Sequence, residues 1–166
     1  MKKLFIALAV IIFSSFDASC AHALDSYTAT GSASVTLARP LSVSQTRDLN
    51  FGTIEIADNA DTISLDFDNV INSVNGSSNI GGAPSPAQFS AAGQPNTAFA
   101  ITISNTSLTG SGQPIPLNNL QHDAGDNPRF DGSGISIFNV VGELQTNANQ
   151  APGAYTGQYQ VVVNYP

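Results

Sequence analysis

The chain has 166 residues, a net charge of −7 and few charged side chains, which make up 10% of the sequence. After residue 23 the only basic residues are Arg39, Arg47 and Arg129, so the acidic surface disfavours binding to nucleic acid or to anionic lipid. The only cysteine, Cys20, lies before that point, which excludes a disulfide in the rest of the chain and leaves stability to packing and strand pairing.

The first residues have the pattern of an export signal. A basic start is followed by an apolar run over residues 4–13 and by Ala21-His22-Ala23, a small-x-small cleavage pattern. The run is too short for a membrane-spanning helix, which needs about 20 apolar residues. We therefore predict a cleaved signal peptide over residues 1–23 and no membrane insertion afterwards. One domain is expected over residues 24–166, in the periplasm, at the cell surface or outside the cell.

The next stretch alternates in the manner of a β-strand. Serine or threonine fills most of its even positions, whereas its odd positions hold small or apolar residues, namely Tyr27, Ala29, Gly31, Ala33, Val35 and Leu37. Side chains on a strand alternate between its two faces, so this pattern predicts an amphipathic N-terminal strand within residues 24–38. Arg39-Pro40 ends the pattern.

Short strand signals separated by turn residues then recur along the chain. This pattern predicts an all-β, immunoglobulin-like antiparallel sandwich of about eight or nine strands. A β-bulge is predicted at Gly52-Thr53, where the alternation changes parity. Further strands are expected at Ile63–Phe67, Phe89–Ala91, Phe99–Ile103 and Ile135–Leu144, and polar loops over residues 72–86, 104–116 and 121–134.

The residues usually found in catalytic sites are scarce. His122 is the only histidine after residue 23, and a hydrolase site would combine it with Asp123 or Asp126 and a serine, yet no serine lies in a nucleophile elbow. Zinc needs several convergent Cys or His ligands, which residues 24–166 do not contain. We predict a protein that is not an enzyme and uses no cofactor.

Aspartates gather in two parts of the chain. One group comprises Asp58, Asp61, Asp66 and Asp68, and the other comprises Asp123, Asp126 and Asp131. Carboxylates are the ligands that Ca²⁺ prefers, but the spacing matches no calcium-binding loop. A solvated acidic face is the favoured interpretation, with calcium binding as the alternative.

The last stretch repeats the alternation with larger side chains. From Tyr155 to Tyr165 the odd positions are aromatic, β-branched or glycine, and all but one of the even positions are polar. This pattern predicts a half-buried strand with an aromatic and β-branched face. Such a strand either pairs within its own fold or offers an edge to another chain.

The alternating stretches at the two ends of the chain together resemble a known family. Gly153 and the next-to-last residue Tyr165, with alternating apolar residues between them, resemble the C-terminal motif of bacterial chaperone–usher pilus subunits. The N-terminal strand around Gly31 is similar to the donor strand of those subunits. The stretches Arg47-Asp-Leu-Asn-Phe-Gly-Thr-Ile54 and 142–159 also resemble a group of uncharacterised bacterial secreted, fimbria-like domains.

The resemblance implies a sandwich that lacks one strand. A periplasmic chaperone would first fill the gap, and the N-terminal strand of a neighbouring subunit would then replace it. The chain would be a structural subunit of a fimbria or pilus-like homo-polymer. Its donor face would comprise the six odd positions from Tyr27 to Leu37, and its accepting edge would comprise Gly153, Tyr155, Tyr159, Val161, Val163 and Tyr165.

The same amphipathic pattern also suits an N-terminal strand that pairs inside its own domain, so the sequence leaves both arrangements open. In the second arrangement the chain would be a monomeric secreted or surface-bound binding domain. It would contact a ligand through the loops over residues 72–86 and 121–134.

Overall fold

The computed structural model describes residues 26–166, and the predicted signal peptide over residues 1–23 lies outside them. The described residues contain no helix with the length and apolar character needed to cross a bilayer. Their strands are β1 (Ser42–Arg47), β2 (Thr53–Glu55), β3 (Asp61–Leu65), β4 (Ile71–Ser73), β5 (Ser78–Gly81), β6 (Ala87–Ala92), β7 (Ala100–Ser104), β8 (Thr106–Gly110), β9 (Ile115–His122), β10 (Ile135–Thr146), β11 (Tyr155–Thr156) and β12 (Gln160–Asn164).

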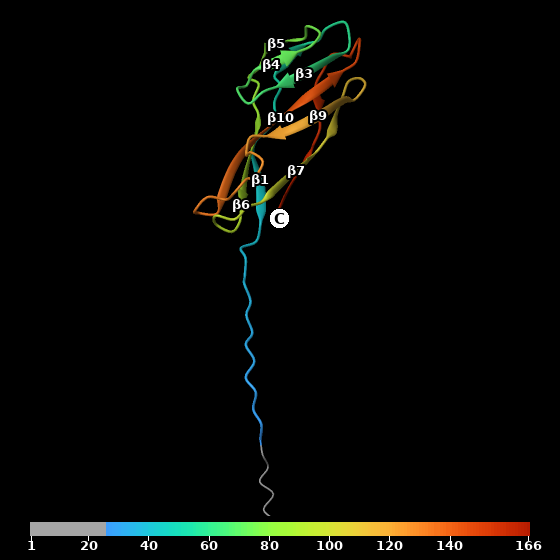
Figure 1. The fold of residues 1–166 in the computed structure, drawn as a ribbon. Coiled ribbons are helices and arrows are strands. Elements are labelled where there is room, and N and C mark those ends of the chain that lie inside the picture. Colours follow the sequence, from blue (N-terminus) through green and yellow to red (C-terminus); the bar gives the residue numbers. More distant parts are fainter. Residues whose placement is uncertain (1–25) are drawn as a thin grey trace, which may run out of the picture. The chain divides into compact units, whose positions relative to one another are not determined.

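The other strands are arranged around β10. Its first half pairs with β6, and its second half pairs with β3 on one side and β9 on the other, always antiparallel. The sheet continues from β6 to β1, from β3 to β4, and from β9 through β8 to β11. Figure 1 shows β10 running through the domain, with β6 near one end and β3, β4 and β5 near the other.

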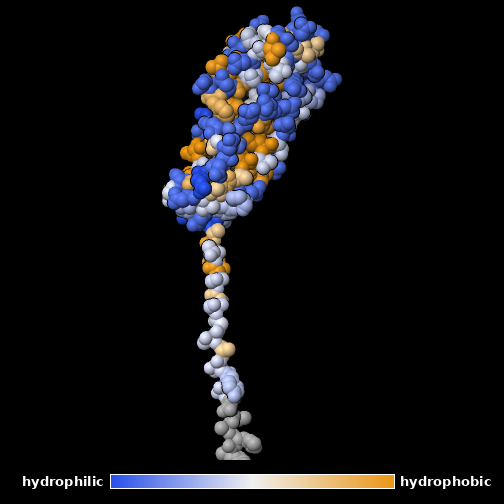
Figure 2. All heavy atoms as spheres, viewed as in Figure 1, coloured by the Kyte–Doolittle hydropathy of each residue, from blue (hydrophilic) through white to orange (hydrophobic). Residues whose placement is uncertain are grey.

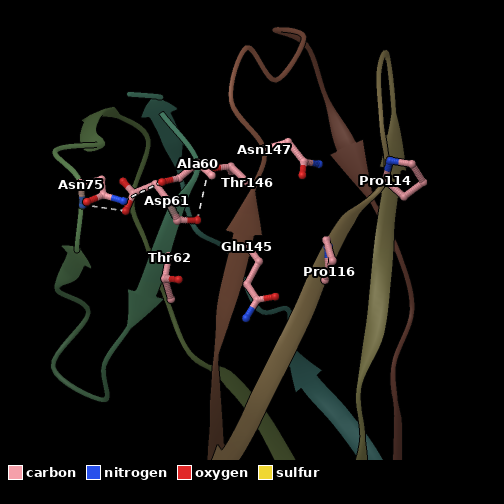
Figure 3. A pocket seen from close by; sticks show the side chains of 9 residues that line it. All are labelled: Ala60, Asp61, Thr62, Asn75, Pro114, Pro116, Gln145, Thr146 and Asn147. Atoms are coloured by element: carbon pink, nitrogen blue, oxygen red, sulfur yellow. Dashed lines mark hydrogen bonds between the residues drawn. The ribbon is translucent and has the colours of Figure 1, made fainter. Parts of the chain in front are cut away.

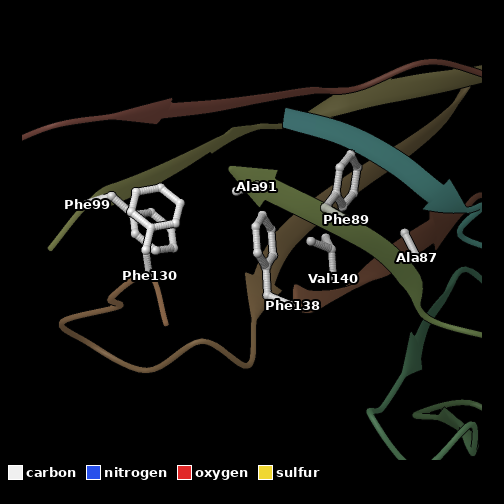
Figure 4. Close-up of a cluster of buried hydrophobic side chains, with 7 residues drawn as sticks. All are labelled: Ala87, Phe89, Ala91, Phe99, Phe130, Phe138 and Val140. Carbon is white, nitrogen blue, oxygen red and sulfur yellow. The ribbon is translucent and has the colours of Figure 1, made fainter. Parts of the chain in front are cut away.

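A second layer, formed by β7 and β12, packs on this sheet through the larger core cluster. The cluster consists of Ala87, Phe89, Ala91, Phe99, Phe130, Phe138 and Val140. Phe89 stacks on Phe138 with ring centroids 5.7 Å apart, and Figure 4 shows these rings on the sheet. Isoleucines of β7 and valines of β12 pack against the cluster from the other layer. Fully burying a side chain of this size stabilises a fold by roughly 1.5–3 kcal/mol, and these partly buried side chains contribute less. The predicted all-β sandwich is confirmed.

A second core cluster lies where β3, β9 and β10 meet. It consists of Phe51, Ile63, Leu65, Ile115, Leu117 and Leu144. Tyr159 and Leu49 pack against both clusters and so connect them. The predicted bulge near Gly52 is confirmed: this residue has a φ of +76°, and the register of β2 against β5 shifts between Thr53 and Ile54.

Several predicted boundaries were wrong. The segment expected to be a loop over residues 72–86 contains the end of β4 and all of β5, and the one over residues 104–116 contains β8 and the start of β9. β3 ends at Leu65, so Phe67 lies in the following turn and is 39% exposed. These short strands are largely polar, so their alternation is weak, and they form because a neighbouring strand supplies backbone hydrogen bonds.

Residues 26–36 and residues 37–166 are separate units, of which the second contains all of the strands. Residues 26–40 form no strand and are exposed throughout. The N-terminal strand predicted within residues 24–38 is therefore not formed in the single chain. A strand needs a ladder partner to satisfy its N–H and C=O groups, and no described residue supplies one here.

Candidate functional site

In the described part of the chain β1 and β12 each have one free edge, as do β2, β4, β5, β7 and β11. β1 pairs only with β6, and β12 pairs only with β7. Cα atoms of β1 and β12 come within 8 Å of each other, yet no backbone hydrogen bond is formed between these strands. We call the facing edges of β1 and β12 the β1–β12 seam. Free edges of this kind offer N–H and C=O groups to which another strand can bond.

Apolar side chains from both strands line the β1–β12 seam. Val43 lies opposite the buried Ala91 and so faces the core, but it is 37% exposed. Val161 and Val163 pack against the larger core cluster and are only partly buried. In Figure 2 apolar atoms interrupt the polar surface in the middle of the domain, in the region where β1 and β7 lie in Figure 1. Another strand added here would increase the burial of these side chains.

Tyr165 connects the two strands at one end of the seam. Its hydroxyl donates a hydrogen bond to the Arg39 carbonyl at 2.8 Å and accepts one from the Gln94 backbone N–H at 2.7 Å. Because Arg39 precedes β1 and Tyr165 follows β12, the end of β12 lies beside the start of β1. The two strands therefore run antiparallel, and the ring of Tyr165 packs edge-on against Phe130.

Tyr159 lies at the start of β12 and is half-buried. Its ring packs edge-on against Phe89, and its hydroxyl is buried without a hydrogen-bond partner in the described residues. Burial, with a smaller contribution from the negative charge of Asp48, raises the pKa of Tyr159 to about 12. The aromatic and valine positions predicted from Tyr159 to Tyr165 thus line one face of β12, next to the core.

The other two residues of the predicted accepting edge lie elsewhere. The C-terminal stretch is not one continuous strand, because it divides into β11 and β12 around Gly157. Tyr155 belongs to β11 and pairs with Gly110 of β8, and its hydroxyl donates to the Ala151 carbonyl. Gly153 has a φ of +142° and lies in the turn before β11. Gly153 and Tyr155 therefore belong to the β8 edge and not to the β1–β12 seam.

The six predicted donor positions are all exposed in the single chain. Tyr27 is 91% exposed, Val35 80% and Leu37 85%. A side chain built at Gly31 would meet no atom within 4 Å. The structure therefore contains an exposed amphipathic segment and, separately, the free edges of β1 and β12 among its other free strand edges.

The cavity at the other end of the domain is polar. It has a volume of about 370 Å³ and lies near β3 and the end of β10 (Figure 3). Its lining consists of Ala60, Asp61, Thr62, Asn75, Pro114, Pro116, Gln145, Thr146 and Asn147.

Asp61 is a buried carboxylate, and no sequence pattern distinguishes it from the other aspartates. It is 4% exposed and accepts hydrogen bonds from the Ser73 hydroxyl and from the backbone N–H groups of Val74, Asn75 and Ser77. Burial acts to raise the pKa of Asp61, but these hydrogen bonds outweigh it, so its pKa lies well below the usual range. The expectation of a solvated position was wrong for Asp61, which fixes the loop between β4 and β5.

Other aspartates also bond to the backbone. Asp66 and Asp131 each accept hydrogen bonds from N–H groups two and four residues later, which closes the turns that follow. Hydrogen bonds led by that from the Ser133 side chain lower the pKa of Asp131. The described residues bring no three acidic, histidine or cysteine side chains together as metal ligands.

His122 and Asp123, adjacent in the sequence, make different contacts in the structure. The carboxylate of Asp123 accepts hydrogen bonds from the backbone and side-chain nitrogens of Asn139, both at 2.7 Å. The His122 ring packs edge-on against Phe138, and its Nδ1 atom is buried without a hydrogen-bond partner in the described residues. Asp126 and His122 line a second cavity of about 320 Å³.

Comparison with known proteins identifies a family and no individual relative. No curated protein and no solved structure matches the chain. The family described as "Domain of unknown function (DUF4402)" matches residues 41–165, which include every strand of the structure. The chain therefore belongs to the DUF4402 family.

Proposed function

We propose that the chain is an exported structural subunit of a fimbria or pilus-like surface assembly, and that its subunits join by β-strand complementation. The observation that carries this proposal is that one chain contains two features that each lack a binding partner. Residues 27–37 form an exposed segment with one apolar face, and the β1–β12 seam has free edges next to a partly buried apolar layer.

The two features have matching chemistry. A strand added at the seam gains main-chain hydrogen bonds along its length, and its alternate side chains enter the apolar layer. β1 has six residues, which corresponds to a length of about 20 Å at roughly 3.3 Å per residue. Residues 27–37 are long enough to cover it. Ala29, Gly31 and Ala33, in the middle of their inward face, are small.

Gly31 lies at the centre of the donor face, so it provides the test. Gly31→Phe is expected to abolish assembly while the domain stays folded, because a side chain at residue 31 meets no other atom in the single chain. Ser32→Phe is the matched control, since it places the same ring on the opposite face of the strand. Assembly is measured by gel filtration and by the ladder on an SDS gel run without heating.

Comparing the two variants distinguishes a specific effect on the donor face from a nonspecific effect of an added phenylalanine ring. Loss of the ladder in Gly31→Phe together with a normal ladder in Ser32→Phe supports the donor face. Normal assembly of Gly31→Phe would show that residues 27–37 are not the strand that joins the subunits. Thermal unfolding of both variants, monitored by circular dichroism, reports whether the domain is intact.

A further inference from the structure

The polar cavity of about 370 Å³ near β3 and the end of β10 has no part in the strand pairing described above. We propose that it binds a neutral hexose residue of a glycan. All of its lining residues belong to the single unit over residues 37–166. The binding site is therefore present in every copy of the chain, whether or not the copies assemble.

The floor of the cavity is the outward face of the sheet. Ile63 lies opposite Leu144, and both side chains are buried in the second core cluster. Thr62 lies opposite Gln145, one position away on each strand, so these two side chains point to the other side of the sheet. Figure 3 shows Gln145 between Thr62 and Pro116. A ligand can therefore occupy the cavity without disturbing the core.

The polar groups of the cavity are largely unused by the protein itself. The Thr62 hydroxyl and the Gln145 amide form no hydrogen bond with the residues drawn around them in Figure 3. The amide nitrogens of Asn75 and Asn147 donate to other residues of the domain, so the Oδ1 atom of each remains an acceptor. Hydroxyl and amide groups supply both donors and acceptors without a charge. This set suits a ligand that carries several hydroxyl groups, each of which both donates and accepts.

The cavity offers no charge to a ligand. Asp61 is the only ionisable residue among the described residues that line it. Its two oxygens already accept four hydrogen bonds, about as many as a carboxylate can accept, so it has no position left for a cation. A phosphate or carboxylate would find no basic partner in this lining and would be repelled by the negative charge of Asp61. The ligand that fits this chemistry is neutral.

Two prolines add an apolar surface beside the polar groups. Pro114 and Pro116 line the cavity, and Figure 3 shows them on the opposite side of Gln145 from Asn75. A hexose ring presents C–H groups on its faces and hydroxyl groups at its edge, so it can use both surfaces. The volume lies at the lower end of the range for small-ligand sites, roughly 300–1,000 Å³, which suits one sugar residue. Pro114, Asn75 and Asn147 are exposed, so the rest of a glycan can continue into solvent.

Saturation-transfer difference NMR tests the proposal, because it detects weak binding to a single subunit and to a large assembly alike. The exported protein, expressed from residue 1, is titrated with the methyl glycosides of glucose, galactose and mannose. The uronate forms of the same glycosides, which carry a carboxylate in place of the hydroxymethyl group, are the charged counterparts. We expect saturation transfer to at least one neutral glycoside and none to its uronate.

Two substitutions in the floor of the cavity locate the binding. Gln145→Ala should raise the Kd of the bound glycoside about tenfold, which corresponds to the loss of about two hydrogen bonds. Thr62→Val, which removes one hydroxyl and keeps a β-branched side chain, should raise it by a smaller factor. Gln158→Ala is the matched control, since it removes the same amide at an exposed position outside the cavity. Thermal unfolding by circular dichroism reports whether each variant is folded.

The absence of saturation transfer from the wild type to all of the neutral glycosides would overturn the proposal. An unchanged Kd in folded Gln145→Ala and Thr62→Val would also overturn it, because the sugar would then bind elsewhere. An equal loss of binding in Gln158→Ala would have the same meaning. Equal binding of a uronate would refute the selectivity for a neutral ligand. Each of these results leaves the proposed function standing, because strand complementation is measured separately by the ladder on the unheated gel.

Discussion

Asp61→Asn is the substitution for which the structure gives the clearest expected magnitude. The Oδ1 atom of Asp61 accepts from Val74 and Asn75, and its Oδ2 atom accepts from Ser73 and Ser77. An asparagine keeps one oxygen, so either orientation leaves two donors facing an amide nitrogen. Each buried donor without an acceptor costs about 1–3 kcal/mol, so the loss in the free energy of unfolding is about 3 kcal/mol. For a domain of this size that lowers Tm by about 12 °C.

The pH dependence of this difference provides a second test. The folded-state pKa of Asp61 is depressed, so its contribution is complete above the unfolded-state value of about 4 and is lost as the pH falls toward the folded-state pKa. Thermal unfolding monitored by circular dichroism should therefore show a large gap between wild type and Asp61→Asn at pH 7. The gap should narrow steadily below pH 4.

The control for Asp61→Asn is Asp58→Asn, which changes the charge by the same amount at an exposed position. It is expected to change the free energy of unfolding by less than about 0.5 kcal/mol. A Tm for Asp61→Asn within about 2 °C of the wild type at pH 7 would refute the argument from the four hydrogen bonds. A gap that stays constant from pH 7 to pH 2 would refute the assignment to the charged carboxylate.

Two further predictions concern a glycine and a tyrosine. Gly134→Ala should lower the free energy of unfolding by about 1–3 kcal/mol or more, measured by urea unfolding. Residue 134 has a φ of +85°, and its added Cβ would collide with the Gly93 carbonyl. The control Gly132→Ala places its methyl group in open space and should be nearly neutral. Tyr159→Phe removes a buried hydroxyl without a partner and should leave the free energy of unfolding unchanged or raise it by up to about 1 kcal/mol at pH 7. Since the folded-state pKa of Tyr159 is raised to about 12, the wild type should lose stability relative to Tyr159→Phe between pH 10 and 12, and parallel pH profiles would contradict this.

Strand alternation predicted the parts of the fold in which one face is buried. The inward face of β12, from Tyr159 to Tyr165, was identified because its apolar residues recur at every second position. The same holds for Phe89 and Ala91 in β6. The strands that were missed are β4, β5, β8 and β9. β4, β5 and β8 are short and their residues are exposed or only partly buried, so their sequences record little burial. β9 has buried Ile115 and Leu117, but its proline and paired asparagines are typical of a loop.

Single contacts between residues far apart in the sequence could not be predicted from local sequence patterns. Phe130 lies in a loop rich in glycine and aspartate, yet it is 2% exposed and stacks on Phe99 with centroids 4.3 Å apart. The donors to Asp61 come from residues at least 12 positions later in the chain. The anchoring of Arg39 by Tyr165 joins residues 126 positions apart, so only the folded chain reveals that this tyrosine, predicted as part of an accepting edge, also fixes the entry to β1.

The central position of β10 has a consequence for how the domain unfolds. One half of this strand carries Phe138 and Val140 of the larger core cluster, and the other half carries Leu144 of the second. Disordering β10 would therefore remove the sheet pairing beneath both clusters at once. We therefore expect that neither cluster persists as an independent foldon and that residues 37–166 unfold in a single cooperative transition in spite of having two cores.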